Sequence, residues 1–356
     1  MTMRYKLLGR SGLRVSEMAL GTMTFGTEWG WGADNAESRK QFELYAASGG
    51  NFLDTADIYT NGTSERILGE LVGPEREHFV IATKYSFSTG ADVNASGNHR
   101  KNLVHSLEGS LRRLGTDYVD LYWVHAWDAI TPVEETMRAL DDMVRAGKVL
   151  HVGISDAPAW WIARANTVAE SHGWTPFTAV QLRYSLLDRT PERELLPMAN
   201  ALDLGVTPWN PLGAGVLTGK YNTDHARYRP AEPRRKETPG YAFGQTVPKR
   251  DLHIAATVVQ IADEISFSPA QVALAWLRQR PGTQVPIVGA RTHQQLADNL
   301  GYLNLTLDPT QTTVLDNVTT VDLGFPHDML QETGAGLRGG EYSDRLDVPN
   351  NRLNHS

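Results

Sequence analysis

Four polar residues with acid–base side chains lie at the ends of short apolar runs in the sequence. Asp54, Lys84 and His125 each end or directly follow such a run, and Tyr59 comes soon after Asp54. Each has a structural explanation when it is taken alone. A histidine at a strand end is more often a hydrogen-bonded core residue, and a lysine there can extend its ammonium to water. The four residues indicate chemistry only when they are taken together.

An aspartate and a lysine at adjacent buried strand ends need each other, because an unpaired buried charge is costly. An ammonium beside the phenol of Tyr59 favours the phenolate, which predicts a phenol pKa pulled down from about 10 towards neutrality. Such a tyrosine is a proton donor suited to carbonyl reduction, in which His125 can orient the substrate oxygen. Because no side chain donates hydride, this chemistry requires a nicotinamide cofactor.

These residues belong to a pattern in which strand and helix signals alternate along the chain. The opening predicts a β-hairpin, with strands at 5–8 and 13–15 around a turn at 9–12. Eight apolar runs then predict strands at 17–20, 51–54, 79–83, 118–125, 149–155, 178–182, 206–209 and 285–288. Helical patterns fall at 37–47, 64–71, 101–114, 132–146, 158–171, 191–201, 269–280 and 293–303.

Continuous apolar strands separated by helices predict a parallel sheet covered by helices, and eight repeats favour a closed barrel. The fold class is therefore α/β, a (β/α)8 TIM barrel with an N-terminal β-hairpin and long loops over its C-terminal face. We expect one barrel domain at residues 1–323 and a polar C-terminal tail at 324–356. An open doubly wound sheet would show Gly-x-Gly-x-x-Gly after its first strand, whereas residues 21–26 are Gly-Thr-Met-Thr-Phe-Gly.

In such a barrel successive strands are neighbours, so the four acid–base side chains should meet at the rim where barrel enzymes carry out their chemistry. Residues 221–250 and 323–356 do not fit the repeating pattern. Each is either a solvated loop or tail, or a lid over the barrel mouth.

Local signals predict where several helices begin and end. Thr131 and Ser268 each precede a proline and are expected to cap a helix with their hydroxyl groups. Five glycines lie where helices are expected to stop, namely Gly49, Gly115, Gly147, Gly173 and Gly205.

Composition excludes several classes of function. The 356 residues are 41% hydrophobic and carry a formal charge of −7, which argues against capture of nucleic acid or anionic membrane. The absence of cysteine excludes disulfides, thiol nucleophiles and cysteine metal sites. The histidines show no metal-binding spacing, so no metal site is predicted. Without a signal peptide or an apolar run long enough to span a membrane, we expect a cytoplasmic protein. The sequence does not decide between a monomer and a homo-oligomer.

Several longer motifs resemble the aldo-keto reductase family. The opening residues 8–16 and 20–26 are similar to the family's hairpin and first strand. Residues 51–59, Asn-Phe-Leu-Asp-Thr-Ala-Asp-Ile-Tyr, are similar to its second-strand motif. The resemblance implies an NADP-dependent oxidoreductase that interconverts small-molecule aldehydes or ketones and alcohols, with NADPH/NADP+ as cofactor. It places the family's catalytic tetrad on Asp54, Tyr59, Lys84 and His125, with Tyr59 as general acid and base.

The resemblance also implies which residues bind the cofactor, group by group. Gly21, Thr22 and Met23, together with Asp54, match the loop under the nicotinamide ribose. Ser155, Asp156 and Gln181 match the group that holds the carboxamide, and Trp209 matches the aromatic that stacks on the nicotinamide. Asn210, Pro211, Leu212, Gly213, Gly215 and Lys220 match the pyrophosphate loop. Gly289, Arg291, Gln295 and Asn299 match the adenine and 2′-phosphate site, which favours NADP over NAD.

One residue departs from the family pattern, because Asp156 stands where asparagine is commoner. A carboxylate accepts from an amide nitrogen but cannot donate to an amide oxygen.

Two other functions remain open. The family resembles the β subunits of potassium channels, so the chain could be an NADPH-binding regulatory subunit. A barrel isomerase or aldolase would instead use Lys84 as a Schiff base, which leaves the nicotinamide loops unexplained. Aromatic residues that could line an apolar mouth are Trp29, Trp31, Tyr85, Trp127 and Tyr241 or Phe243.

Overall fold

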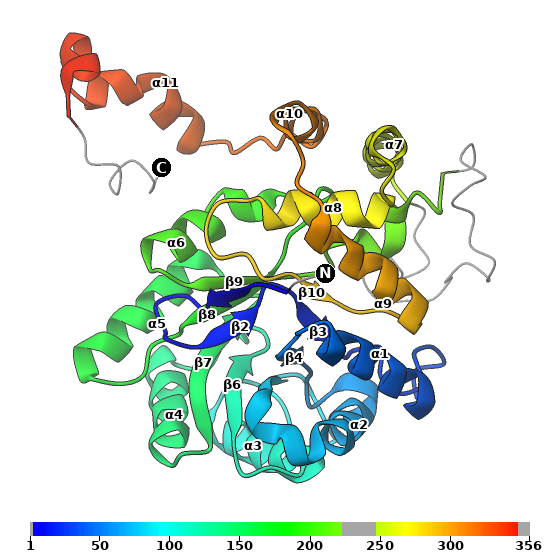
Figure 1. Ribbon diagram of the computed structural model, residues 1–356. Coiled ribbons are helices and arrows are strands. Elements are labelled where there is room, and N and C mark those ends of the chain that lie inside the picture. The colour runs from blue at the N-terminus through cyan, green and yellow to red at the C-terminus, as the bar shows by residue number, and fades with distance from the viewer. Residues whose placement is uncertain (1–2, 223–246, 348–356) are drawn as a thin grey trace.

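The computed structural model describes residues 3–222 and 247–347, and Figure 1 shows eight strands surrounded by helices. The eight strands are all parallel and follow the order β10-β3-β4-β5-β6-β7-β8-β9. A parallel bridge between Val206 and Gln284 closes the ring. The strands are β3 (Ala19–Gly21), β4 (Phe52–Asp54), β5 (Val80–Tyr85), β6 (Val119–Val124), β7 (Val149–Ser155), β8 (Ala179–Arg183), β9 (Gly205–Trp209) and β10 (Ile287–Val288). The predicted TIM barrel is confirmed.

Helices surround this barrel, and the last one, α11 (His327–Leu337), extends away from it (Figure 1). The others are α1 (Asn35–Ala47), α2 (Thr63–Val72), α3 (Arg100–Leu114), α4 (Val133–Arg145), α5 (Ala159–His172), α6 (Leu195–Ala201), α7 (Lys249–Ile265), α8 (Pro269–Arg278), α9 (His293–Leu300) and α10 (Pro309–Val318). The sequence did not predict α7, α10 or α11. No helix among the described residues is both long and apolar enough to cross a bilayer.

The predicted N-terminal hairpin is present and closes the barrel at the N-terminal ends of its strands. It pairs β1 (Tyr5–Leu7) with β2 (Arg14–Ser16) in antiparallel register. Leu8 is fully buried and belongs to the same apolar cluster as strand residues inside the barrel. Gly205 was expected to end a helix, and that expectation is wrong, because it begins β9. A Cβ there would lie 2.8 Å from the Leu8 side chain, so glycine is needed for the close approach of the hairpin.

The two predicted hydroxyl caps have different outcomes. Ser268 caps α8, because its side chain accepts from the backbone N–H of Gln271 while the Gln271 side chain accepts from the N–H of Ser268. The Thr131 cap is wrong. The N-cap of α4 is Pro132, and the Thr131 hydroxyl instead donates to Asp128 Oδ2 at 2.6 Å.

The two segments outside the repeating pattern can be placed only in part. Most of 221–250 lies outside the described residues, so its role as a lid stays a prediction, and its last residues begin α7. The predicted polar tail contains α11, which extends away from the barrel in Figure 1. Its residues are largely exposed, as expected of a polar segment, but the helix itself was not predicted.

Candidate active site

The four predicted acid–base residues converge at the carboxyl-terminal rim of the barrel. Asp54 ends β4, Lys84 lies near the end of β5, His125 follows β6, and Tyr59 begins the short 3₁₀ helix η1 (Tyr59–Gly62). The Lys84 ammonium is fully buried and uses all three of its donors. Lys84 Nζ lies 2.5 Å from Asp54 Oδ1, 2.7 Å from the Thr55 carbonyl oxygen and 3.1 Å from the Tyr59 hydroxyl.

The protonation states follow from burial and from this pairing. Burial raises the pKa of Tyr59, while the Lys84 charge lowers it and the Asp54 charge raises it again. The predicted fall of the Tyr59 pKa towards neutrality is therefore wrong for the protein alone, because burial outweighs the Lys84 charge and the Asp54 charge opposes that charge further. Burial works against the Lys84 ammonium, but the Asp54 charge and the hydrogen bonds to Asp54 and Tyr59 raise its pKa overall. The site thus holds a protonated phenol next to a permanent ammonium.

His125 lies beside the Tyr59 phenol and is uncharged. The two ring centroids are 5.9 Å apart with an interplanar angle of 80°. Burial and the Lys84 charge hold the pKa of His125 well below its usual value. Its Nδ1 is buried and has no hydrogen-bond partner. An uncharged imidazole with an unsatisfied polar atom suits a residue that contacts a bound molecule.

The predicted carboxamide group surrounds a recess of about 410 Å³ at the same rim. Asp156, Gln181 and Trp209 all line it, and the fully buried Ser155 precedes them at the end of β7. Trp209 Nε1 donates to Asp156 Oδ1 at 3.0 Å. Loss of surrounding water raises the pKa of Asp156, although the residue stays exposed at the rim. Apolar side chains complete the lining, and none of the four acid–base residues contributes to it. A recess of this volume with a few polar groups on an apolar lining can take one planar heterocycle such as nicotinamide.

Gln181 has a contact that sequence reasoning missed. Its side-chain Nε2 donates to Asp54 Oδ2 at 3.0 Å, so it holds the second oxygen of the carboxylate that binds Lys84. Gln181 therefore links the recess to the tetrad.

The predicted loop after β3 lies directly against β4. Gly21 pairs in register with Asp54, and the Thr22 backbone N–H donates to the Asp54 carbonyl oxygen at 2.9 Å. Thr22 is fully buried, whereas Met23 is half-buried and follows it towards the rim.

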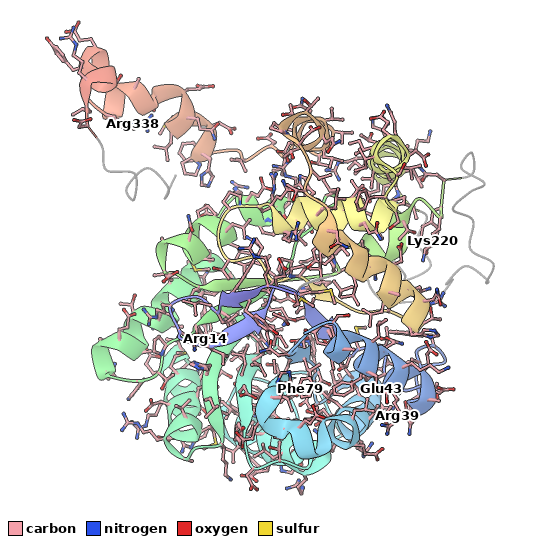
Figure 2. The ribbon with its side chains drawn as sticks, in the orientation of Figure 1. Arg14, Arg39, Glu43, Phe79, Lys220 and Arg338 are labelled. Atoms are coloured by element: carbon pink, nitrogen blue, oxygen red, sulfur yellow. The ribbon has the colours of Figure 1, made fainter. Side chains whose placement is uncertain are left out.

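The predicted pyrophosphate loop follows β9 and forms the 3₁₀ helix η4 (Gly213–Thr218). Asn210, Gly213 and Gly215 all have positive φ, which turns the chain tightly after the strand. A Cβ on Gly215 would lie 2.4 Å from Lys220 Nζ, so glycine lets the ammonium lie against bare backbone. The 3₁₀ helix η4 packs against α7. Lys220, labelled in Figure 2, follows η4 in the chain. Pro211 and Leu212 complete the turn.

The predicted 2′-phosphate residues lie at the start of α9, after β10. Arg291 directly precedes the N-cap residue Thr292, and its backbone N–H donates to Gln295 Oε1 at 3.0 Å. Gly289 is exposed and Asn299 is buried. Glu37 was not predicted here, but its carboxylate accepts hydrogen bonds from the backbone N–H and the imidazole of His293. The first turn of α9 is therefore partly satisfied within the protein, and Arg291 lies directly before it in the chain.

Comparison with known proteins decides the family. The sequence model described as the aldo/keto reductase family matches residues 17–319. The chain belongs to the aldo/keto reductase family. A norsolorinic acid reductase of Emericella nidulans is 37% identical over 336 residues, covering 91% of this chain and 83% of the relative. A putative aryl-alcohol dehydrogenase of Saccharomyces cerevisiae is 33% identical over 349 residues, covering 93% of this chain and 91% of the relative. An aldo-keto reductase of Aspergillus calidoustus is 36% identical over 340 residues, covering 92% of this chain and 85% of the relative.

Aromatic rings surround the acid–base residues of this aldo/keto reductase. Trp29 stands edge-on to Tyr59 with centroids 6.4 Å apart, and Phe87 stands edge-on to His125 at 4.7 Å. Trp29 also contacts Trp31 at 5.6 Å. Trp127 contacts Trp160 edge-on at 5.8 Å, and Trp160 is 59% exposed.

Not all of the aromatic residues predicted to line the mouth of the barrel lie there. Tyr85 is fully buried and stacks on Tyr122 inside the protein, so its candidacy for the mouth is wrong. Tyr241 and Phe243 lie outside the described residues. Phe87 was missed, although its place just after the strand that carries Lys84 is a signal that could have found it.

Two rival chemistries of this aldo/keto reductase can be weighed against the geometry. Among residues 3–222 and 247–347, no group of three or more histidine, aspartate and glutamate residues could hold a metal ion. A Schiff-base lysine needs a free amine and a lowered pKa. The Lys84 ammonium has a raised pKa and all of its donors in use, which argues against that role.

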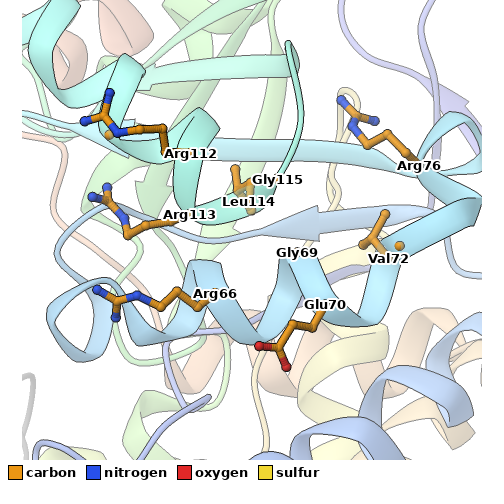
Figure 3. A pocket seen from close by; sticks show the side chains of 11 residues that line it. Arg66, Gly69, Glu70, Val72, Arg76, Arg112, Arg113, Leu114 and Gly115 are labelled. Carbon is orange, nitrogen blue, oxygen red and sulfur yellow. The ribbon is translucent and has the colours of Figure 1, made fainter.

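A larger cavity of about 500 Å³ lies away from this chemistry, between α2 and α3 (Figure 3). Four arginines line it, and two of them hold buried acids. Arg76 binds Asp120 and Arg113 binds Glu65. A Cβ on Gly69 would lie 2.5 Å from the Leu114 carbonyl oxygen, so the groove follows from close packing of the two helices. None of the four acid–base residues lines it.

Proposed function

We propose that this protein is an NADPH-dependent oxidoreductase that interconverts aromatic aldehydes or ketones and the corresponding alcohols. The observation that carries the proposal is the 3.1 Å contact between Lys84 Nζ and the Tyr59 hydroxyl at an aromatic rim beside the recess of Asp156 and Trp209. NADPH, when bound, supplies the hydride for the carbonyl carbon. Its nicotinamide would be held by Ser155, Asp156, Gln181 and Trp209, and its phosphates by Lys220 and Arg291.

The side chains then handle the oxygen and the proton. Negative charge develops on the substrate oxygen as hydride arrives at carbon, and donors placed there stabilise the transition state. Tyr59 gives its phenolic proton to that oxygen, and the uncharged His125 orients the oxygen. Lys84 stabilises the phenolate left on Tyr59, and Asp54 with Gln181 keeps Lys84 in place.

Aromatic substrates are supported by the rings that face this chemistry. Trp29 and Phe87 stand edge-on to the two residues that would contact the substrate oxygen, which leaves flat apolar surfaces for a substrate ring. Relatives described as aryl-alcohol dehydrogenases point the same way.

The test is a Tyr59→Phe variant assayed with a panel of aromatic and aliphatic aldehydes. We expect turnover to fall by roughly 10²–10⁴-fold, the usual contribution of a positioned acid, while NADPH still binds. Tyr5→Phe is the control, because Tyr5 is 52% exposed on the hairpin at the opposite end of the barrel. Decrease of NADPH absorbance measures turnover, and the same panel with NADH measures the preference for NADP.

Two results would contradict the proposal. Full turnover by Tyr59→Phe would remove this tyrosine from its role. Tight NADPH binding by the native protein without turnover of any substrate would instead favour the regulatory-subunit function.

A further inference from the structure

Asp156 is held in the recess by its backbone conformation and by two hydrogen bonds. Its backbone has φ of 42°, a left-handed conformation that asparagine and aspartate tolerate better than most residues. Its N–H donates to the Gln181 carbonyl oxygen at 3.3 Å, and its Oδ1 accepts from the Trp209 indole at 3.0 Å. The asparagine that is commoner here in the family has the same shape, and its amide oxygen could accept the same bond. The hydrogen bond alone therefore does not require a carboxylate.

Charge is what distinguishes this aspartate from asparagine. The Lys84 ammonium is balanced by Asp54 at 2.5 Å, and the phenol and imidazole of the tetrad are uncharged. Arg183, the other cation facing Asp156, is paired with Asp188 at 2.6 Å. Asp156 thus gives the rim one negative charge that no described neighbour balances with an ion pair.

The two redox states of a nicotinamide differ by one charge. The oxidised ring is positive and the reduced ring is neutral, so a nearby carboxylate attracts only the oxidised form. On the basis of the proposed function, we propose that Asp156 is a specificity-determining residue that makes the site bind NADP+ in preference to NADPH, relative to the same site with asparagine.

This selection favours use of the site for alcohol oxidation. In that direction Tyr59 first releases its phenolic proton to solvent. The alcohol carbon then gives a hydride to NADP+, its hydroxyl proton passes to the Tyr59 oxygen, and the carbonyl compound and NADPH are the products. The positive charge that Asp156 attracts disappears in this step, so the product cofactor is held less tightly than the reactant.

Isothermal titration calorimetry of the full-length native protein and Asp156→Asn with NADP+ and with NADPH tests this selection. We expect the variant to bind NADP+ roughly tenfold more weakly, slightly more than a unit-charge pair at contact distance contributes when it is screened as in water, with little change for NADPH. Asp203→Asn is the matched control. Asp203 also has a positive φ, 50°, but it precedes β9 at the opposite end of the barrel, so both affinities should be unchanged.

The outcomes separate this inference from the proposed function. If the native protein binds neither form, the proposed function itself fails. If Asp156→Asn no longer binds either NADP+ or NADPH, the Asp156→Ser variant is measured in the same way, because serine keeps an oxygen acceptor. A ratio of the two affinities that stays unchanged or shifts towards NADP+ overturns the inference. Loss of both forms in both variants also overturns it, because Asp156 would then hold the cofactor irrespective of its charge.

Discussion

At the scale of single residues, the buried pair of Lys84 and Asp54 couples the chemistry of the rim to the stability of the barrel. Neither side chain reaches water appreciably, since their side chains are 0% and 3% exposed. The Asp54 carboxylate would lose its one charged partner if the ammonium were removed and would keep the neutral Gln181 side chain. A buried charge without its counter-ion is among the most destabilising changes that a single mutation can produce.

We therefore expect Lys84→Met to lower the free energy of unfolding by about 3–5 kcal/mol, as well as to abolish turnover. Urea denaturation followed by circular dichroism measures the loss. Arg164→Ala is the control, because Arg164 pairs with Glu134 on the surface, where such a pair contributes only about 0–1 kcal/mol. Equal losses in the two variants would show that the buried pair has no special role in stability.

The convergence of the tetrad could be predicted from sequence, because the ends of neighbouring parallel strands must meet at one rim. The direction of the Tyr59 pKa could not. It depends on the balance between burial, Lys84 and Asp54, and strand order does not supply the 2.5 Å and 3.1 Å contacts of Lys84 that set this balance. The bond from Gln181 to Asp54 was missed for the same reason, because the two residues are 127 positions apart.

At the scale of elements, helix starts show what a local signal can predict. Ser268 and Thr131 both stand before a proline, yet only Ser268 caps its helix. Ser268 is followed three residues later by Gln271, which returns a hydrogen bond to the Ser268 N–H and completes a capping box. The Thr131 hydroxyl instead donates a hydrogen bond to the carboxylate of Asp128, three residues earlier, and does not cap the helix.

Ser268→Ala should therefore destabilise the protein by about 0.5–2 kcal/mol, since the first turn of α8 loses an acceptor for its N–H groups. The midpoint of thermal unfolding measures this. Thr167→Ala is the matched control, because the Thr167 hydroxyl lies on the exposed face of α5 and donates only to the Ala163 carbonyl oxygen. Alanine has the higher helix propensity there, so no loss is expected. A Ser268 variant as stable as this control would contradict the role of the cap.

The missed helices have a common cause. The eight-fold pattern assigns one helix to each strand, but the connection from β9 to β10 contains both α7 and α8. Likewise α10 and α11 follow the last strand–helix repeat, where the barrel pattern predicts no further helix. Counting repeats predicts the elements that the barrel requires and overlooks those added to it.

At the scale of the whole molecule, stability should depend on pH through an acid that lies beneath the rim. Asp57 is 3% exposed, and neither of its carboxylate oxygens has a hydrogen-bond partner. It lies between the barrel and the helices that carry Glu65 and Arg113. Burial and the Glu65 charge raise the pKa of Asp57 to about 7, against a smaller opposing effect of Arg113.

The native state therefore keeps the Asp57 proton up to about pH 7, whereas the unfolded chain releases it near pH 4. Between these values the unfolded state binds fewer protons, so stability falls as pH rises, by up to about 1.4 kcal/mol per pH unit from this group. Asp57→Asn cannot lose a proton, so its stability relative to the native protein should increase steadily from pH 5 to pH 7 and then level off. Urea denaturation of both proteins across this range measures the difference. Asp328→Asn, on the exposed face of α11, should follow the native protein at every pH. A constant difference for Asp57→Asn would mean that Asp57 is already ionised in the folded protein at pH 5.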